Sequence, residues 1–210
     1  MIDFSQNVAA TLSQADRIQR VPSPKLTLFT LRAFLDAGEC TRLITMIDAQ
    51  RRPSTIADAN GDDAFRTSET CDLDMSDPLV AAIDARLSEL TGIPPAFGEP
   101  LQGQRYDVGQ EFKAHTDYFT PGGADFDQYC SVSGQRTWTA MIYLNETQAG
   151  GGTRFKDIGK TFQPESGRLL AWNNRTDDGG VNPATIHHGM KVRKGIKYVV
   201  TKWYREREWA

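Results

Sequence analysis

The sequence predicts an α+β domain in which N-terminal helices pack on a C-terminal β core. Three observations lead to this prediction. Apolar residues recur at helical spacing between residues 36 and 94 and are bounded by capping residues. From Leu101 onward, short β-like runs are separated by Gly, Pro, Asn and Asp, which indicates a sandwich or a barrel. No linker divides the 210 residues, a length that suits one domain.

The first element is an arm or helix at residues 1–22, and residues 23–210 are expected to form a single domain. The partly alternating run KLTLFTLRAFL at 25–35 predicts a strand. A helix capped by Asp36 follows, with an apolar face formed by Leu43, Ile44 and Ile47. A second helix is predicted after Ser-Asp-Pro at 76–78, with apolar residues at Leu79, Ile83, Leu87 and Leu90.

The β core is expected at about 100–206. Its clearest strands are the runs TWTAMIYLN, GRLLAWN and KYVVTKWY. The segments 57–65 and 118–130 are each interpreted either as a lid that orders on substrate binding or as a surface loop.

Composition excludes several classes of protein. A formal charge of -3 and a pI near 5.6 give no reason to expect nucleic acid or an anionic membrane as a partner. No apolar run of about 18 residues exists, and the first residues lack the apolar stretch of a secretory signal. Three cysteines without a CxxC pair fit reduced thiols, so a cytoplasmic location is expected. The oligomeric state is not predicted.

The chain has three histidines, and their placement suggests a metal site. His115 and Asp117 are two residues apart, so on an extended segment they project to the same side. His187 and His188 follow about 70 residues later, near the start of a predicted strand. Two imidazoles and one carboxylate on one face of a metal are the ligands of non-haem Fe(II) oxygenases. Zinc accepts similar ligands, so the motif alone leaves the metal open.

Lys197 lies ten residues beyond His187 in the last predicted strand. Alternation places it on one strand face with Val199, Thr201 and Trp203. A buried lysine on the metal side needs an anion, because an unpaired buried charge is costly. The distal carboxylate of 2-oxoglutarate is such an anion. The alternative is an exposed strand lysine.

In these blocks the sequence resembles the prolyl 4-hydroxylase branch of the 2-oxoglutarate/Fe(II)-dependent dioxygenases. The similarity runs through roughly residues 66–206, most of the chain. It includes, in order, Arg66-Thr67-Ser68, LQGQRYDVGQEFKAHTDYF, GQRTWTAMIYLN, GGTRF, GRLLAW and HHGMKVRKGIKYVVTKW. A chance His-x-Asp motif does not explain so many blocks in order.

The resemblance implies that His115, Asp117 and His187 are the iron ligands. His187 is the implied ligand rather than His188 because of the family's spacing to later positions, namely Val192, Gly195, Lys197 and Trp203. His188 is then expected either to contact one of the metal ligands without binding the metal itself or to lie at the surface.

Further residues receive roles from the same resemblance. Lys197 is expected to pair with the distal carboxylate of 2-oxoglutarate, in a pocket lined by Tyr106, Thr153 and Trp203. Arg136 matches a position on the peptide side. Phe112 stands where the family usually has tyrosine, three residues before the first ligand, so a polar contact on the substrate side is missing.

The fold implied by the resemblance is a double-stranded β-helix, or jelly roll, with N-terminal helices that support one sheet. The implied cofactors are Fe(II), 2-oxoglutarate and O2, with ascorbate as an optional reductant, and the products are succinate, CO2 and a hydroxylated substrate. Three interpretations remain open: hydroxylation of a prolyl residue in a peptide or protein, hydroxylation of a free amino acid or other small molecule, and a binding or sensor module without turnover. Fold-level analogy does not decide between them.

Overall fold

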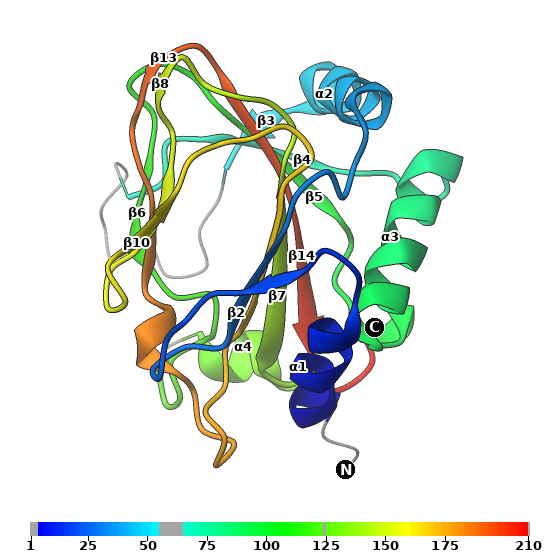
Figure 1. Cartoon of the computed structure of the whole chain (residues 1–210), viewed down its shortest axis with the longest axis vertical. Helices are drawn as coiled ribbons and strands as arrows, with labels where there is room; N and C mark the ends of the chain where they lie inside the picture. Colours follow the sequence, from blue (N-terminus) through cyan, green and yellow to red (C-terminus); the bar gives the residue numbers. More distant parts are fainter. Residues whose placement is uncertain (1–3, 55–64, 124, 210) are drawn as a thin grey trace.

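The computed structural model describes residues 4–54, 65–123 and 125–209. Two antiparallel sheets form the centre of the molecule (Figure 1). The large sheet has the order β1 (Gln19–Arg20), β2 (Leu28–Leu31), β11 (Leu169–Asn173), β7 (Arg136–Tyr143), β14 (Lys197–Arg205), β5 (Gln102–Tyr106), β4 (Glu69–Asp72) and β3 (Arg52–Pro53). The small sheet has the order β10 (Lys160–Phe162), β9 (Thr153–Phe155), β12 (His187–Gly189) and β6 (Phe112–His115). A separate pair joins β13 (Val192–Lys194) to β8 (Ala149–Gly150).

The N-terminal helices cover the outer face of the large sheet, while the small sheet faces its inner side (Figure 1). The helical elements are α1 (Phe4–Gln14), α2 (Ala37–Gln50), α3 (Pro78–Thr91), η1 (Pro95–Phe97), α4 (Phe126–Cys130) and η2 (Pro183–Thr185). This arrangement confirms the prediction of a jelly-roll core with supporting N-terminal helices.

Local capping explains why the two predicted helices form where they do. Asp36 accepts a hydrogen bond from the backbone of Glu39, whose side chain accepts one in return, so α2 begins with a capping box. The side chain of Asp77 caps α3, which has Pro78 in its first turn. Gly92 ends α3 with φ of 73°, a left-handed conformation that favours glycine.

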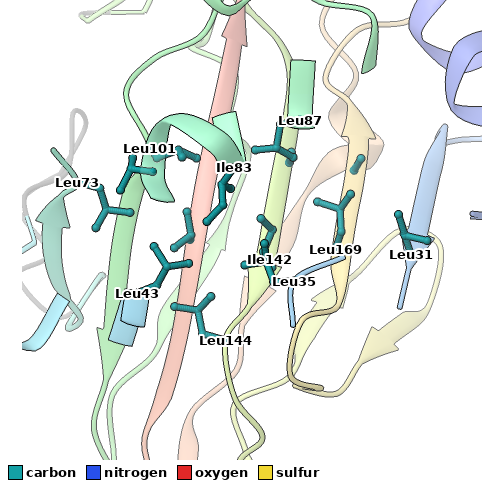
Figure 2. Close-up of a cluster of buried hydrophobic side chains, with 14 of the residues drawn as sticks. Leu31, Leu35, Leu43, Leu73, Ile83, Leu87, Leu101, Ile142, Leu144 and Leu169 are labelled. Atoms are coloured by element: carbon teal, nitrogen blue, oxygen red, sulfur yellow. The ribbon is translucent and has the colours of Figure 1, made fainter. Parts of the chain in front are cut away.

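Apolar side chains fill both interfaces of the large sheet. Figure 2 shows the outer layer, where Leu43 of α2 and Ile83 and Leu87 of α3 lie on the same side of the sheet as Ile142 and Leu169. The inner layer lies between the two sheets and includes Leu28, Tyr106, Tyr143, Phe155, Trp172 and Val199. The functional residues described below belong to this inner layer and to its open end.

Strand β14 supplies residues to both layers because neighbouring strand residues point to opposite faces. Tyr198 and Val200 join the outer layer, and Val199 joins the inner one. Lys202 also points outward, where its ammonium lies 2.6 Å from Asp84 of α3. The predicted inward face of this strand, which begins with Lys197, is therefore confirmed.

The large sheet extends further along the chain than the expected core of 100–206. Strand β2 pairs with β11, and β4 pairs with β5, so segments before residue 100 complete the sheet on both sides. Of the predicted 57–65 loop, only Phe65 is among the described residues. The 118–130 segment contains the short helix α4. None of the described helices is long and apolar enough to cross a membrane.

Candidate active site

The small sheet places two histidines side by side. His115 ends β6 and His187 begins β12, and the two are register partners with ring centroids 4.2 Å apart. The strand stops at His115, so Asp117 does not continue an extended segment as the sequence suggested. It lies in a bend, with Oδ1 at 3.9 Å from His115 Nε2. The ligand atoms of His115, Asp117 and His187 all lie within 4.8 Å of one another.

Hydrogen bonds fix the orientation of all three side chains. His115 Nδ1 lies 2.7 Å from the carbonyl of Lys113, and His187 Nδ1 lies 2.9 Å from the carbonyl of Thr185. A carbonyl can only accept, so Nδ1 is the protonated nitrogen and Nε2 keeps its lone pair. Asp117 Oδ2 accepts a hydrogen bond of 2.7 Å from Thr139 on the opposite sheet. Such outer contacts are typical of residues that orient metal ligands.

The electrostatics of the cluster suit a divalent cation. Burial, and then the neighbouring His187, hold the pKa of His115 well below its usual value, so its imidazole is neutral at pH 7. Burial raises the pKa of Asp117, but His187, His115 and Arg136 outweigh it, and the pKa is lowered overall. Two imidazoles beside an ionised carboxylate form the three-residue ligand set of non-haem Fe(II). The residues present therefore fit the iron that the sequence implied.

His188 is placed away from this cluster. Its Nε2 lies 3.0 Å from Glu111 Oε2, and Glu111 also pairs with Lys191 at 3.3 Å. Adjacent strand residues point to opposite faces, so only His187 reaches the metal side. This matches the expectation that His188 has a surface or supporting role.

Lys197 is a buried cation in the inner layer, 2% exposed. Its register partner is Tyr106 on β5, and Nζ lies 4.9 Å from the Tyr106 ring and 5.6 Å from the Tyr143 ring. In the described part of the chain, no acidic side chain pairs with it. Burial lowers its pKa to about 7. The alternative of an exposed strand lysine is wrong, and the site fits an incoming carboxylate, which would restore the charged form.

Two predicted pocket residues lie near Lys197, together with one that the sequence reasoning missed. Tyr106 donates a hydrogen bond of 2.8 Å to Gln104. Thr153 accepts one of 2.6 Å from the hydroxyl of Tyr143, which had not been singled out. Tyr143 and Thr139 are four residues apart on β7 and so share the inward face. The period-two pattern of TWTAMIYLN contained the signal for both.

A cavity of about 520 Å³ opens beside the triad. His115 and Asp117 are in its wall together with the predicted substrate-side residues Phe112 and Arg136. Trp203 was expected in the 2-oxoglutarate pocket with Lys197, but it lines this cavity, 4.1 Å from the guanidinium of Arg136. The Phe112 ring stacks on His115, with centroids 3.5 Å apart. Lys197, Tyr106 and Thr153 do not line this cavity, so the residues expected around the distal carboxylate lie outside the wall that contains Phe112 and Arg136.

Arg136 is held rigidly in the cavity wall. Its guanidinium makes two hydrogen bonds to Glu99, of 2.6 and 2.8 Å, and a third of 3.3 Å to the carbonyl of Asp117. It contacts two rings, at 4.1 Å from the centroid of Trp203 and 5.0 Å from that of Phe119. Glu99 and Phe119 are further wall residues that the sequence reasoning did not identify.

A jelly-roll core that carries two histidines and a carboxylate at one end defines the class of non-haem iron oxygenases. Residues 101–205 match the family model of the 2OG-Fe(II) oxygenase superfamily. The chain is 31% identical to a probable prolyl 4-hydroxylase 8 of Arabidopsis thaliana, over 92% of this chain and 73% of that protein. The chain therefore belongs to the 2OG-Fe(II) oxygenase superfamily, and it is a dioxygenase that depends on Fe(II) and 2-oxoglutarate.

Solved structures show the same fold. A viral collagen prolyl hydroxylase from Paramecium bursaria Chlorella virus-1, in a 2OG complex, has a TM-score of 0.66 and 23% identity, covering 85% of this chain and 95% of that one. A prolyl-4-hydroxylase from Pseudomonas putida has a TM-score of 0.59 and 19% identity, covering 97% and 99%. The prediction of a prolyl 4-hydroxylase-like dioxygenase is confirmed at the level of family and chemistry.

Proposed function

We propose that this dioxygenase hydroxylates a prolyl residue within a peptide or protein. Similarity to prolyl 4-hydroxylases over 92% of the chain supports this substrate class. The observation that carries the proposal is the cavity of about 520 Å³ beside the triad, whose wall combines aromatic rings with arginines. Such a volume falls in the range of cavities that enclose drug-sized ligands.

When bound, Fe(II) and 2-oxoglutarate supply the oxidising chemistry, in which O2 is consumed, succinate and CO2 are formed, and a substrate C–H becomes C–OH. His115, Asp117 and His187 would hold the metal. Lys197 binds the distal carboxylate of 2-oxoglutarate. Arg136 has five N–H donors, and those not used by Glu99 and the Asp117 carbonyl are available to a substrate carbonyl.

The cellular setting belongs to the same proposal. The three cysteines are free and buried, which suits a reducing compartment and supports a cytoplasmic location. The formal charge of -3 gives no support for nucleic acid as a partner.

One observation favours a second candidate, hydroxylation of a free amino acid. Arg66 lines the cavity, and its guanidinium donates to neutral groups, those of Ser68, Thr70 and Gln102, at 3.0 to 3.3 Å, and contacts the hydroxyl of Tyr106. Within the described ranges no carboxylate pairs with it. Burial, and then Arg136, lower the pKa of Arg66, whereas the Asp117 carboxylate acts to raise it without forming an ion pair. The carboxylate of a free amino acid would provide the missing counter-charge.

The deciding experiment measures succinate release by the iron-loaded enzyme with 2-oxoglutarate. Capped proline-containing peptides, which carry no terminal carboxylate, are compared with free proline and other free amino acids. We expect the capped peptides to stimulate succinate release and to gain one oxygen by mass spectrometry. Stimulation by free amino acids alone would overturn the peptide proposal.

Arg66→Gln provides a second comparison. A free amino acid that uses this guanidinium would lose an ion pair, and its KM would rise by about tenfold or more. A capped peptide offers no carboxylate there and would lose less. Similar losses for both substrates would show that Arg66 does not discriminate between them.

A further inference from the structure

Cations and aromatic rings alternate along the cavity wall. Beyond Trp203 and Arg136, the ring of Phe119 lies 5.2 Å from the guanidinium of Arg205, which in turn lies 5.4 Å from the ring of Trp209. The series therefore leads from Trp203, on the inward face of β14, to Trp209, which is 43% exposed. Tyr129, which is 38% exposed, joins this series because its ring stacks on Phe119, with centroids 5.2 Å apart.

Backbone contacts hold the outer two rings of this series. The amide of Trp209 donates a hydrogen bond of 2.7 Å to the carbonyl of Ala96. Arg205 donates to the carbonyl of Tyr129. Arg207 donates to three carbonyls of the segment that follows Tyr129, those of Cys130, Ser131 and Val132, at 2.6 to 3.0 Å. Tyr129 and Trp209 are thus exposed rings on backbone segments that hydrogen bonds hold in place, which is typical of residues that anchor a binding partner.

The two arginines in this part of the wall, Arg136 and Arg205, both contact the same carboxylate, that of Glu99. Glu99 accepts two hydrogen bonds from Arg136 and a third, of 3.3 Å, from Arg205. The remaining bond of Arg205 goes to a backbone carbonyl, and its side chain is almost fully buried. The two arginines therefore stiffen the wall and do not offer a free anion site. Tyr129 and Trp209 are the exposed aromatic residues of this wall, with the exposed Thr120 and the half-buried Asp125 also lining the cavity.

We propose that Tyr129 and Trp209 form a subsite, called here the aromatic rim, for a proline-rich extended segment next to the target residue. Proline rings are uncharged and apolar, and polyproline II segments enter aromatic-lined grooves with little loss of conformational entropy. An acidic segment is disfavoured beside Tyr129 because Asp125, four residues earlier, lines the same wall, and because Arg136 and Arg205 both already contact Glu99. This inference rests on the proposed function and adds the residues that select the flanking sequence.

Binding is tested first, without turnover. The protein is loaded with iron and 2-oxoglutarate under anaerobic conditions, and a fluorescein-labelled ten-proline peptide is titrated by fluorescence anisotropy. In the Tyr129→Ala/Trp209→Ala double variant we expect the Kd to rise by about tenfold or more, because anchor residues commonly contribute that much. Tyr129→Phe/Trp209→Phe keeps both rings and should restore most of the affinity.

The matched control is Val108→Ala, since Val108 is 61% exposed and does not line the cavity. Its Kd should equal that of the wild type. Unlabelled glycine–serine and glutamate-rich decapeptides are tested as competitors, and both should compete poorly. An unchanged Kd in the double alanine variant, or better competition by the glutamate-rich peptide, would overturn the aromatic rim.

Measurements of turnover distinguish failure of this inference from failure of the proposed function. In the wild type, a proline-rich decapeptide should have a lower KM than a capped tripeptide with one proline. In the double alanine variant that difference in KM should shrink, while kcat for the decapeptide is retained. If the wild type hydroxylates no proline peptide, the proposed function fails. If it hydroxylates both peptides and the KM difference survives in the variant, only the aromatic rim fails.

Discussion

Thr139 and Asp117 are joined across the two sheets by a hydrogen bond of 2.7 Å. Thr139 lies on β7 of the large sheet, whereas Asp117 follows β6 of the small one. The Thr139 hydroxyl also accepts a hydrogen bond of 2.9 Å from Asn174, so its own proton points to the carboxylate. The large sheet therefore sets the direction in which the only carboxylate of the triad faces.

We expect Thr139→Val to weaken iron binding by about 10- to 100-fold, the usual effect of losing an outer contact to a metal ligand. Valine keeps the shape of threonine but cannot donate a hydrogen bond. Iron affinity is measured by anaerobic titration, with circular dichroism to check folding. Thr139→Ser keeps the hydroxyl and should bind iron nearly as well as the wild type. Equal affinities for the valine variant and the wild type would show that Asp117 needs no such support.

Replacing His187 and replacing its neighbour His188 should have different effects on iron binding. His187→Ala removes a triad residue, so the visible charge-transfer band expected with Fe(II) and 2-oxoglutarate under anaerobic conditions should disappear. His188→Ala removes only the contact with Glu111 at the other side of the strand, and the band should persist. A band that survives in His187→Ala and is lost in His188→Ala would reverse the assignment of the ligand.

Lys197 predicts a pH dependence of 2-oxoglutarate binding. In the ligand-free protein its pKa is lowered by burial to about 7. Only the protonated form attracts the distal carboxylate, so affinity should be level below pH 7. Above pH 7 the affinity should fall by up to about tenfold per pH unit, because binding to the neutral lysine takes up one proton. The Kd of 2-oxoglutarate is measured from about pH 6 to about pH 9, which covers both sides of that pKa.

Lys197→Met is the matched control for this titration. It should bind 2-oxoglutarate weakly at every pH and lose the decline above pH 7. Because it also removes a buried charge without an acidic partner, we expect Tm to rise by about 2–4 °C, the shift that 1 kcal/mol gives in a domain of this size. A decline above pH 7 that persists in Lys197→Met would assign the titration to another group.

Local signals in the sequence predicted much of the architecture. Capping residues such as Asp36 act within one turn, so helix starts are encoded close to where they occur. The inward face of Lys197 followed from strand alternation alone. Contacts between segments were harder to predict: Arg66 forms an isolated bridge with Phe112, and Thr139 reaches Asp117 from another sheet. Those pairings depend on sheet register, which no short stretch of sequence contains.

The outward face of β14 gives a prediction about stability. Lys202 is 1% exposed and pairs with Asp84 at 2.6 Å. Asp84→Ala would leave that ammonium buried without its partner, and we expect a loss of about 3–5 kcal/mol in the free energy of unfolding. The double variant Asp84→Leu/Lys202→Met removes both charges and should recover most of the loss. Chemical denaturation measures both values, and a small effect of Asp84→Ala would show that Lys202 finds another partner.

Phe112 provides the last prediction, because it stands on the substrate side of the triad. Its ring stacks on His115 and lines the cavity, while Lys197 lies outside that wall. Phe112→Tyr adds one hydroxyl toward the substrate. A hydrogen bond contributes about 0.5–1.5 kcal/mol, so the KM for a prolyl peptide should fall by roughly 2- to 12-fold if that hydroxyl finds a carbonyl. The apparent affinity for the co-substrate, 2-oxoglutarate, should stay constant. A change only in the apparent affinity for 2-oxoglutarate would contradict the placement of Phe112 on the substrate side.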